Sequence, residues 1–300
     1  MIFPLQDFID KLSDHLRKYN ALEKLMHELQ IDYGLIACIG VEIEFYLSNN
    51  VDLCQFEHLL GMKLIKEKGK NQFEVNLPPT TNIINYIEDI NKVRYKITMV
   101  ANQLQSKVNF RAKPFLDDYG SSMHFHLNFI DTSATHINHE FLNKVASSIG
   151  HYMIETFLVF MSYEEDYLRL DKNFMAPINV SFGNNNRTVA LRIPASYPKR
   201  LEHRIANPLT NIYLAIFTIL NSIYLGLKSP REINNLPKIY GNAFDEQYNL
   251  LPLPKTLADA LKLFKLEFFI PDYQRELMSF DRRQSKLVTL ESLLEIMKKL

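Results

Sequence analysis

Apolar and polar residues alternate in several short stretches of this chain, and this alternation limits the possible fold more than any other feature. In Val41-Glu-Ile-Glu-Phe-Tyr-Leu47 the odd-numbered positions are all apolar. Ser121-Ser-Met-His-Phe-His-Leu-Asn-Phe129 repeats the pattern, with His124, His126 and Asn128 between apolar residues. Successive side chains of a strand point to opposite faces of a sheet, so each stretch predicts a strand with one apolar and one polar face.

The polar faces of these strands are rich in carboxylates. Residues 72–77, 189–193 and 200–205 alternate in the same way, and the polar positions of the set include Glu42, Glu44, Glu74, His124 and Glu202. Neighbouring carboxylates repel one another unless cations lie between them. Oxygen ligands with a single imidazole suit Mg²⁺ or Mn²⁺ better than Zn²⁺. Arginines on the same faces are typical ligands of phosphates and carboxylates, so the pattern favours phosphoryl transfer.

Helical periodicity fills the segments between the strands. It predicts one long helix or two short helices over 5–29, and helices over 82–105, 138–160, 207–227, 256–267, 272–280 and 288–299. The run at 209–227 is long enough to span a membrane, but Thr210, Asn211, Thr218 and Asn221 interrupt it, which favours a buried core helix. We expect an α/β fold: a curved, mostly antiparallel sheet with helices on its convex face and the Glu and His residues on the concave face.

Composition narrows the function classes. The 300 residues are 47% hydrophobic, which is enough for a large core. Lys and Arg number 34, as do Asp and Glu, so neither nucleic acid nor a membrane is an expected partner. Small-molecule substrates are favoured instead. Cys38 and Cys54 read as free thiols, and the first residues do not form a secretory signal, so we expect a cytoplasmic protein.

A series of short motifs resembles the catalytic domain of glutamine synthetase and the related γ-glutamylamine ligases. The resemblance covers roughly residues 38–280, with an implied fold of the glutamine synthetase and guanidino kinase type. Its motifs, in chain order, are Val41-Glu-Ile-Glu-Phe45, Glu67-Lys-Gly-Lys-Asn-Gln-Phe-Glu74, Lys113-Pro114, Gly120-Ser-Ser-Met-His-Phe-His126, Asn186-Arg-Thr188, Arg192-Ile-Pro194 and Arg200-Leu-Glu-His-Arg204.

The resemblance implies roles for individual residues. It implies one Mg²⁺ or Mn²⁺ ion on Glu44, Glu67 and Glu74, and a second on Glu42, His124 and Glu202. His126, Asn128, Arg192 and Arg200 would bind the nucleotide, while Arg187, Arg204 and Arg169 would be catalytic, with Arg187 near the phosphates and the other two on the amino-acid carboxylates. The implied reaction uses ATP to phosphorylate the γ-carboxylate of glutamate or a similar acid, after which an amine displaces phosphate; a homo-oligomer is compatible with the family.

Three departures from the family pattern affect the expected acceptor. Met175 stands where the family has a glutamate that deprotonates ammonium, and a thioether cannot take a proton. Tyr119 replaces an asparagine, and Ser122 replaces a glycine. An amine other than ammonia is therefore expected.

The organisation of the chain also departs from the family. We expect one catalytic domain over 1–300: a helical extension (1–38) in place of the family's opening β domain, a sheet core for metal and nucleotide (39–228) and a helical part (229–300). Two alternatives stay open for the function, a phosphotransferase on the same fold and a non-catalytic or degenerate nucleotide-binding relative.

Overall fold

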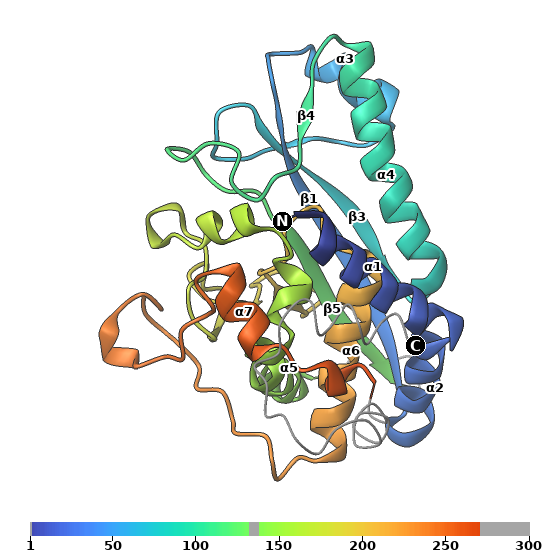
Figure 1. Cartoon of the computed structure of the whole chain (residues 1–300), viewed down its shortest axis with the longest axis vertical. Coiled ribbons are helices and arrows are strands. Elements are labelled where there is room, and N and C mark those ends of the chain that lie inside the picture. The colour runs from blue at the N-terminus through green and yellow to red at the C-terminus, as the bar shows by residue number, and fades with distance from the viewer. Residues whose placement is uncertain (1, 132–137, 271–300) are drawn as a thin grey trace.

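A computed structural model describes residues 2–131 and 138–270 of the chain. The elements in chain order are α1 (Ile2–Lys18), α2 (Ala21–Tyr33), β1 (Leu35–Leu47), α3 (Leu53–Leu60), β2 (Ile65–Lys66), β3 (Gln72–Thr80), α4 (Ile83–Gln103), β4 (Val108–Asn109), β5 (Met123–Asp131), α5 (His139–Phe160), the 3₁₀ helices η1 (Glu164–Arg169) and η2 (Lys172–Phe174), β6 (Phe182–Asn184), β7 (Leu191–Ile193), β8 (Leu201–His203), α6 (Ile212–Lys228), η3 (Glu246–Tyr248), α7 (Leu257–Leu263) and η4 (Leu266–Phe268). Figure 1 shows the long strands β1, β3 and β5 side by side.

The strands of the described residues form one eight-stranded sheet in the order β2-β3-β1-β5-β8-β7-β6, with β4 paired to β1. All pairs are antiparallel except β6 with β7. The predicted α/β class with a mostly antiparallel sheet is therefore confirmed. The apolar set of the long strands β1 and β5, which includes Val41, Ile43, Phe125 and Leu127, is buried.

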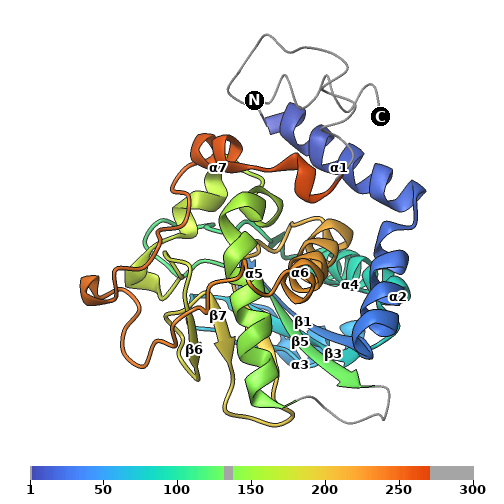
Figure 2. The ribbon, with the colours of Figure 1, turned by 90° about the horizontal axis from the view of Figure 1, so that it is seen from below.

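Helices cover the apolar face of the sheet. Figure 2 shows α5 and α6 next to each other over the strands, with α4 and α2 beyond α6. Helix α6 is almost entirely buried, as expected for the apolar run at 209–227, and it begins after Asn211, whose side chain accepts a hydrogen bond from the Leu214 amide. No helix among the described residues is long and apolar enough to cross a membrane.

The predicted helices agree with the structure in position, with some differences at their ends. The 5–29 segment forms two helices, α1 and α2, separated at Asn20, which has a left-handed backbone. The sequence did not predict α3, although Asp52 caps its first amides and Gly61 ends it in the left-handed region. The helices predicted over 272–280 and 288–299 lie outside the described residues. The division at residues 38 and 228 stays a prediction.

One β-bulge shapes the centre of the sheet. Strand β1 pairs Ile39 with Thr80 and Val41 with Leu77, so β3 uses one residue more than β1 over this step. The extra residue falls in Pro78-Pro79, where proline lacks the N–H that a regular ladder would need. Gly40 stands opposite this bulge, and its other neighbour across the ladder is His126 of β5.

Candidate functional site

The polar face of the sheet brings the predicted ligands into adjacent rows. Glu44 of β1 pairs with Glu74 of β3, and Glu42 pairs with His124 of β5. Further along, Glu202 of β8 lies between His126 of β5 and Arg192 of β7. The residues come from five strands, and the antiparallel register alone places their side chains on one surface.

Two cavities lie over this surface. The first, which we call the acidic cavity, has a volume of about 270 Å³ and is lined by the six predicted metal ligands and by four predicted arginines: Glu42, Glu44, Glu67, Glu74, His124, Glu202, Arg169, Arg187, Arg192 and Arg204. The second, the apolar cavity, has a volume of about 430 Å³, and its lining includes Val41, Leu77, Pro79, Tyr197, His126, Asn128 and Arg200. Glu42 lines both, so the two cavities share a wall.

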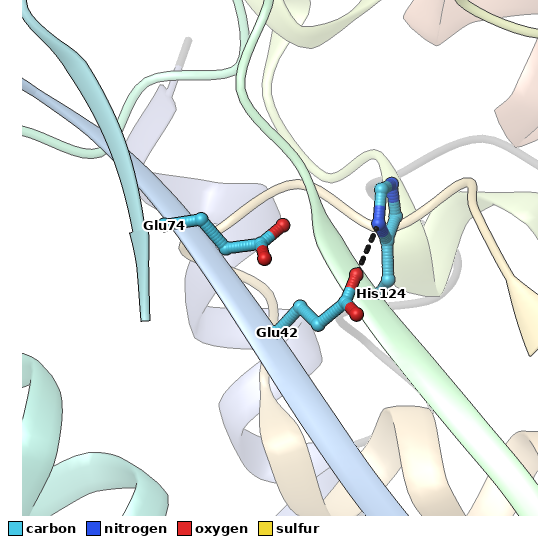
Figure 3. Close-up of side chains that lie close together, drawn as sticks. All are labelled: Glu42, Glu74 and His124. Atoms are coloured by element: carbon cyan, nitrogen blue, oxygen red, sulfur yellow. Dashed lines mark hydrogen bonds and ion pairs between the residues drawn. The ribbon is translucent and has the colours of Figure 1, made fainter. Parts of the chain in front are cut away.

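Every predicted site residue therefore lies in one of two neighbouring cavities. The sequence grouped Arg192 with the nucleotide residues, whereas the structure has it in the acidic cavity, separate from His126, Asn128 and Arg200. The two predicted metal sets lie next to each other. Ligand atoms of Glu42, Glu74 and His124 lie within 4.8 Å of one another, which combines members of both predicted metal sets (Figure 3).

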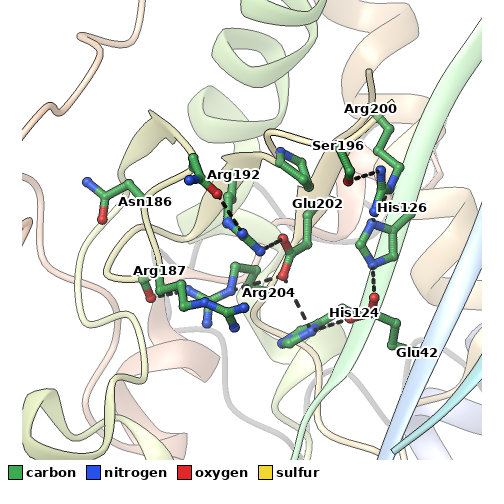
Figure 4. Close-up of polar contacts among 12 residues, drawn as sticks. Glu42, His124, His126, Asn186, Arg187, Arg192, Ser196, Arg200, Glu202 and Arg204 are labelled. Carbon is green, nitrogen blue, oxygen red and sulfur yellow. Dashed lines mark hydrogen bonds and ion pairs between the residues drawn. The ribbon is translucent and has the colours of Figure 1, made fainter. Parts of the chain in front are cut away.

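A network of ion pairs holds the ligands of the second predicted set. His124 Nδ1 lies 3.0 Å from Glu42 Oε2 and 3.5 Å from Glu202 Oε1. Arg192 Nη1 donates to Glu202 Oε2 at 2.8 Å, and Arg204 Nε lies 3.2 Å from Glu202 Oε1 (Figure 4). Because Glu202 is buried and paired on both oxygens, its carboxylate has a fixed orientation.

The neighbouring histidine links this network to the apolar cavity. His126 Nε2 lies 2.8 Å from Glu42 Oε1, and Arg200 Nε donates to His126 Nδ1 at 3.0 Å. Arg200 also donates to Ser196 Oγ at 3.1 Å (Figure 4). The chain Glu42-His126-Arg200 thus runs along the wall between the two cavities.

Charges in the acidic cavity separate the pKa values of its carboxyls. Burial raises the pKa of Glu74 to about 9, helped by the negative charges of Glu42, Glu44 and Glu67. Burial and the charge of Glu44 also raise the pKa of Glu67. Burial acts in the same direction on Glu42, but hydrogen bonds and charges of His124 and the adjacent histidine outweigh it and lower the pKa of Glu42. The carboxylates of Glu42 and Glu202 thus have histidine and arginine side chains as partners, while the side around Glu74 is short of positive charge.

Ser122 has a positioning role that the sequence did not predict. Its amide donates to Glu44 Oε2 at 2.8 Å, and its hydroxyl lies 2.7 Å from His124 Nε2. The sequence marked Ser122 only as a departure from a family glycine. Its place two residues before His124, which alternation directs to the same side, was the available signal.

The arginines differ in how free their side chains are. Arg169 is buried, and its Nη1 and Nη2 donate to the carbonyls of Ile205 and Arg204 at 2.8 and 2.9 Å. It holds the backbone beside Arg204 and does not present a free guanidinium. Arg204 in turn donates from Nη1 to the carbonyls of Arg187 and Val189. Arg187 is exposed at the cavity, and none of the described residues forms an ion pair with it.

The comparisons with known proteins agree on one family. A family model described as "Glutamine synthetase, catalytic domain" matches residues 51–273, which begins after β1 and so excludes Glu42 and Glu44. Gamma-glutamylputrescine synthetase PuuA of Escherichia coli (strain K12) is 28% identical over 298 residues, covering 82% of this chain and 61% of the relative. Glutamine synthetase of Sulfolobus acidocaldarius is 29% identical over 148 residues, covering 44% of this chain and 31% of the relative.

Solved structures support the fold. A GmaS/ADP complex superimposes with a TM-score of 0.73 at 18% identity, covering 93% of this chain and 71% of that chain. Plasmodium falciparum glutamine synthetase gives a TM-score of 0.66 at 13% identity, covering 93% and 74%. The chain spans less than two thirds of the length of the two curated relatives named above.

Proposed function

The chain belongs to the glutamine synthetase catalytic-domain family, and from this premise we propose that it is an ATP-dependent ligase. It would join glutamate or a similar acid to an amine through an acyl phosphate. The observation that carries the proposal is the convergence of six carboxylate and imidazole ligands and four arginines on one cavity, next to an apolar cavity of a size suited to a small molecule.

The acidic cavity is chemically suited to Mg²⁺ or Mn²⁺. Its donors are carboxylate oxygens and one imidazole, which these cations accept. Burial, together with the charges of Glu42, Glu44 and Glu67, raises the pKa of Glu74, and a bound cation would favour its ionised form. We propose that Glu44, Glu67 and Glu74 hold one ion and that Glu42, His124 and Glu202 hold a second. Bound ions would neutralise phosphate and carboxylate oxygens that otherwise repel each other.

The apolar cavity is the proposed site of the nucleotide base. Val41, Leu77, Pro79 and Tyr197 supply apolar surface to it, and Asn128 supplies a buried amide. The phosphates would then extend past Glu42 toward the acidic cavity, along the wall that His126 and Arg200 form. Because ATP is the proposed substrate, a cytoplasmic location is proposed with it.

The arginines have separate tasks in the proposed reaction. Arg187 has an exposed guanidinium that can bind a phosphoryl group by paired hydrogen bonds. Arg192 and Arg204 hold Glu202 in place, and Arg169 fixes the backbone that carries Arg204. Donors held in advance in this way need no rearrangement when charge develops on the transferred group.

The acceptor is proposed to be an amine other than ammonia. Met175 lines the acidic cavity at the end of η2 and cannot accept a proton. The residues on either side of it in this cavity, Phe174 and Ala176, are apolar.

Hydroxylamine trapping tests the ligase proposal. Hydroxylamine is a small nucleophile that converts an acyl phosphate to a hydroxamate, so Mg²⁺, ATP, L-glutamate and hydroxylamine should yield γ-glutamyl hydroxamate and ADP. Glu202→Gln should reduce the rate at least about a hundredfold, while Glu88→Gln, on the exposed face of α4, should not change it.

Other outcomes would select the alternatives. ADP release with a stable phosphorylated product and no hydroxamate would favour a phosphotransferase. Metal-dependent ATP binding without turnover would favour a non-catalytic relative.

A further inference from the structure

A further cavity lies among helices α1, α4 and α6. It has a volume of about 210 Å³, and its lining includes Asp10 and Arg17 of α1, Arg94 of α4, and Tyr213 of α6. We call it the helix cavity. It shares no lining residue with the acidic cavity or the apolar cavity, and the ligase proposal assigns none of its residues.

Two arginine side chains line the helix cavity, and neither forms an ion pair with a carboxylate of the described residues. Arg94 Nη2 donates to the Thr210 carbonyl at 2.9 Å and lies 3.7 Å from Met123 Sδ. Arg94 Nε is buried and has no hydrogen-bond partner within the part of the chain that the structure describes. Arg17 has its Cζ 4.3 Å from the centroid of the Tyr213 ring. A buried N–H of a charged group is costly when it has no acceptor, so a ligand that accepts from Arg94 would be stabilising.

The start of α6 adds positive potential to the cavity, and one aspartate reduces it. The first amides of a helix have no partner within the helix and carry a partial positive charge. The Asn211 side chain accepts from the Leu214 amide at 3.1 Å, and the two residues between them line the cavity. Asp10 lines it too, and its Oδ1 accepts from Gln6 Nε2 at 3.0 Å and lies 3.5 Å from Asn211 Nδ2. Two arginines and one aspartate leave the lining with one net positive charge.

We propose that the helix cavity binds a small carboxylate with a single negative charge. Its oxygens would accept hydrogen bonds from Arg94 and Arg17, because a planar guanidinium matches the geometry of a carboxylate. One negative charge brings the sum of charges in the cavity to zero, whereas a second would lie unpaired beside Asp10. Gln6 and Asn91 also line the cavity, and their amides can bond to a hydroxyl group, so glycolate is a suitable probe.

A carboxylate bound in this way would connect three helices. Arg17 belongs to α1 and Arg94 to α4, and Arg94 also holds the Thr210 carbonyl at the approach to α6. A ligand that bridges the two arginines binds only when α1 is in place, so it should stabilise the contact of α1 with the rest of the protein. Amide hydrogen exchange in α1, which reports local opening, should therefore become slower when the ligand is bound.

Calorimetric titration of the metal-free protein with sodium glycolate, at an ionic strength held constant with NaCl, tests the proposal. We expect saturable binding and slower hydrogen exchange in α1. Arg94→Gln and Arg17→Gln should each weaken binding at least about tenfold. Lys18→Gln, the next residue of α1 and also exposed, should not change it. Absence of saturable binding, or binding that Arg17→Gln retains unchanged, overturns the proposal.

Asp10 gives a second measurement of opposite sign. Asp10→Asn removes a negative charge from the lining and should tighten glycolate binding at least about threefold. Asp7→Asn changes an exposed residue of α1 outside the lining and should leave binding unaltered. Glycolate binding that folded Asp10→Asn does not tighten, or tighter binding of dianionic phosphate than of glycolate by the unmodified protein, overturns the assignment of a singly charged carboxylate. Neither result bears on the ligase activity, which hydroxylamine trapping tests separately.

Discussion

Binding of Mg²⁺ should release about one proton at pH 7, and Glu74 should be its main source. The pKa of Glu74 is raised to about 9, so at pH 7 this carboxyl is largely protonated in the metal-free protein. A carboxyl must lose its proton to bind a cation. Glu67, whose pKa is also raised, adds to the release in the same direction, whereas Glu42 and Glu202 have lowered pKa values and are already ionised.

The proton also sets the pH dependence of metal affinity. Removing it at pH 7 costs about 3 kcal/mol, because roughly two pH units separate pH 7 from the pKa of Glu74. Apparent affinity should therefore rise about tenfold per pH unit from pH 7 and level off near pH 9, where the carboxyl ionises without metal. Glu74→Gln should bind more weakly and without this slope.

Calorimetry in buffers of different ionisation enthalpy measures the proton directly. The observed enthalpy plotted against buffer ionisation enthalpy has a slope equal to the number of protons exchanged. We expect a slope of about one at pH 7, unchanged by Glu88→Gln and much smaller for Glu74→Gln, which leaves only the contribution of Glu67. Saturable Mg²⁺ binding by the unmodified protein with a slope near zero would refute the argument, since Glu74 would then be ionised before the metal arrives.

Three further predictions concern stability. Asn207→Ala removes a fully buried amide that donates to Asp166 at 2.6 Å, and should lower the free energy of unfolding by about 2–3 kcal/mol in urea titrations; an unchanged midpoint would count against it. Burial, with nearby positive charge, lowers the pKa of His203 to about 3. The free energy of unfolding therefore has its full value above about pH 6.5, where this histidine is neutral in both states, and it should fall by about 1.4 kcal/mol per pH unit below that pH. His203→Leu should flatten that slope, and an identical slope in the variant would show that other groups cause it. In Gly120→Ala the new Cβ would lie 2.6 Å from Arg169 Cγ. We therefore expect the free energy of unfolding, measured by thermal unfolding, to fall by about 1–3 kcal/mol. A melting temperature equal to that of the unmodified protein would contradict the close contact.

Much of the sheet could be predicted from the sequence because alternation is a local property. The pattern in β1, β3 and β5 showed which side chains share a face, and the structure has Glu42, Glu44, Glu74 and His124 on that face. Alternation does not specify which strands are neighbours. The pairing of β5 with β8 depends on contacts between residues far apart in sequence. Alternation also does not give the direction of a pairing, so the parallel pairing of β6 with β7 could not be predicted from it.

The parts of the site that could not be predicted depend on backbone geometry. The motifs marked Arg169 as a ligand for substrate, but its guanidinium is used by two main-chain carbonyls, which a sequence does not display. Likewise, Ser122 contributes through its backbone amide, a group that every non-proline residue has. The roles predicted for the thirteen site residues stay predictions until binding and turnover are measured.

The bulge at Pro78 and Pro79 determines where related chains can change in length. A residue inserted or deleted within 72–77 would move Glu74 to the apolar face and bring Val75 into the cavity, because each one-residue step reverses the direction of the side chains. At the bulge the ladder already contains an unmatched residue, so a change in length there leaves the pairs from Val41 to Tyr46 intact. Over evolutionary time, insertions and deletions in β3 should therefore collect at residues 78 and 79 and be removed by selection on the side that carries Glu74.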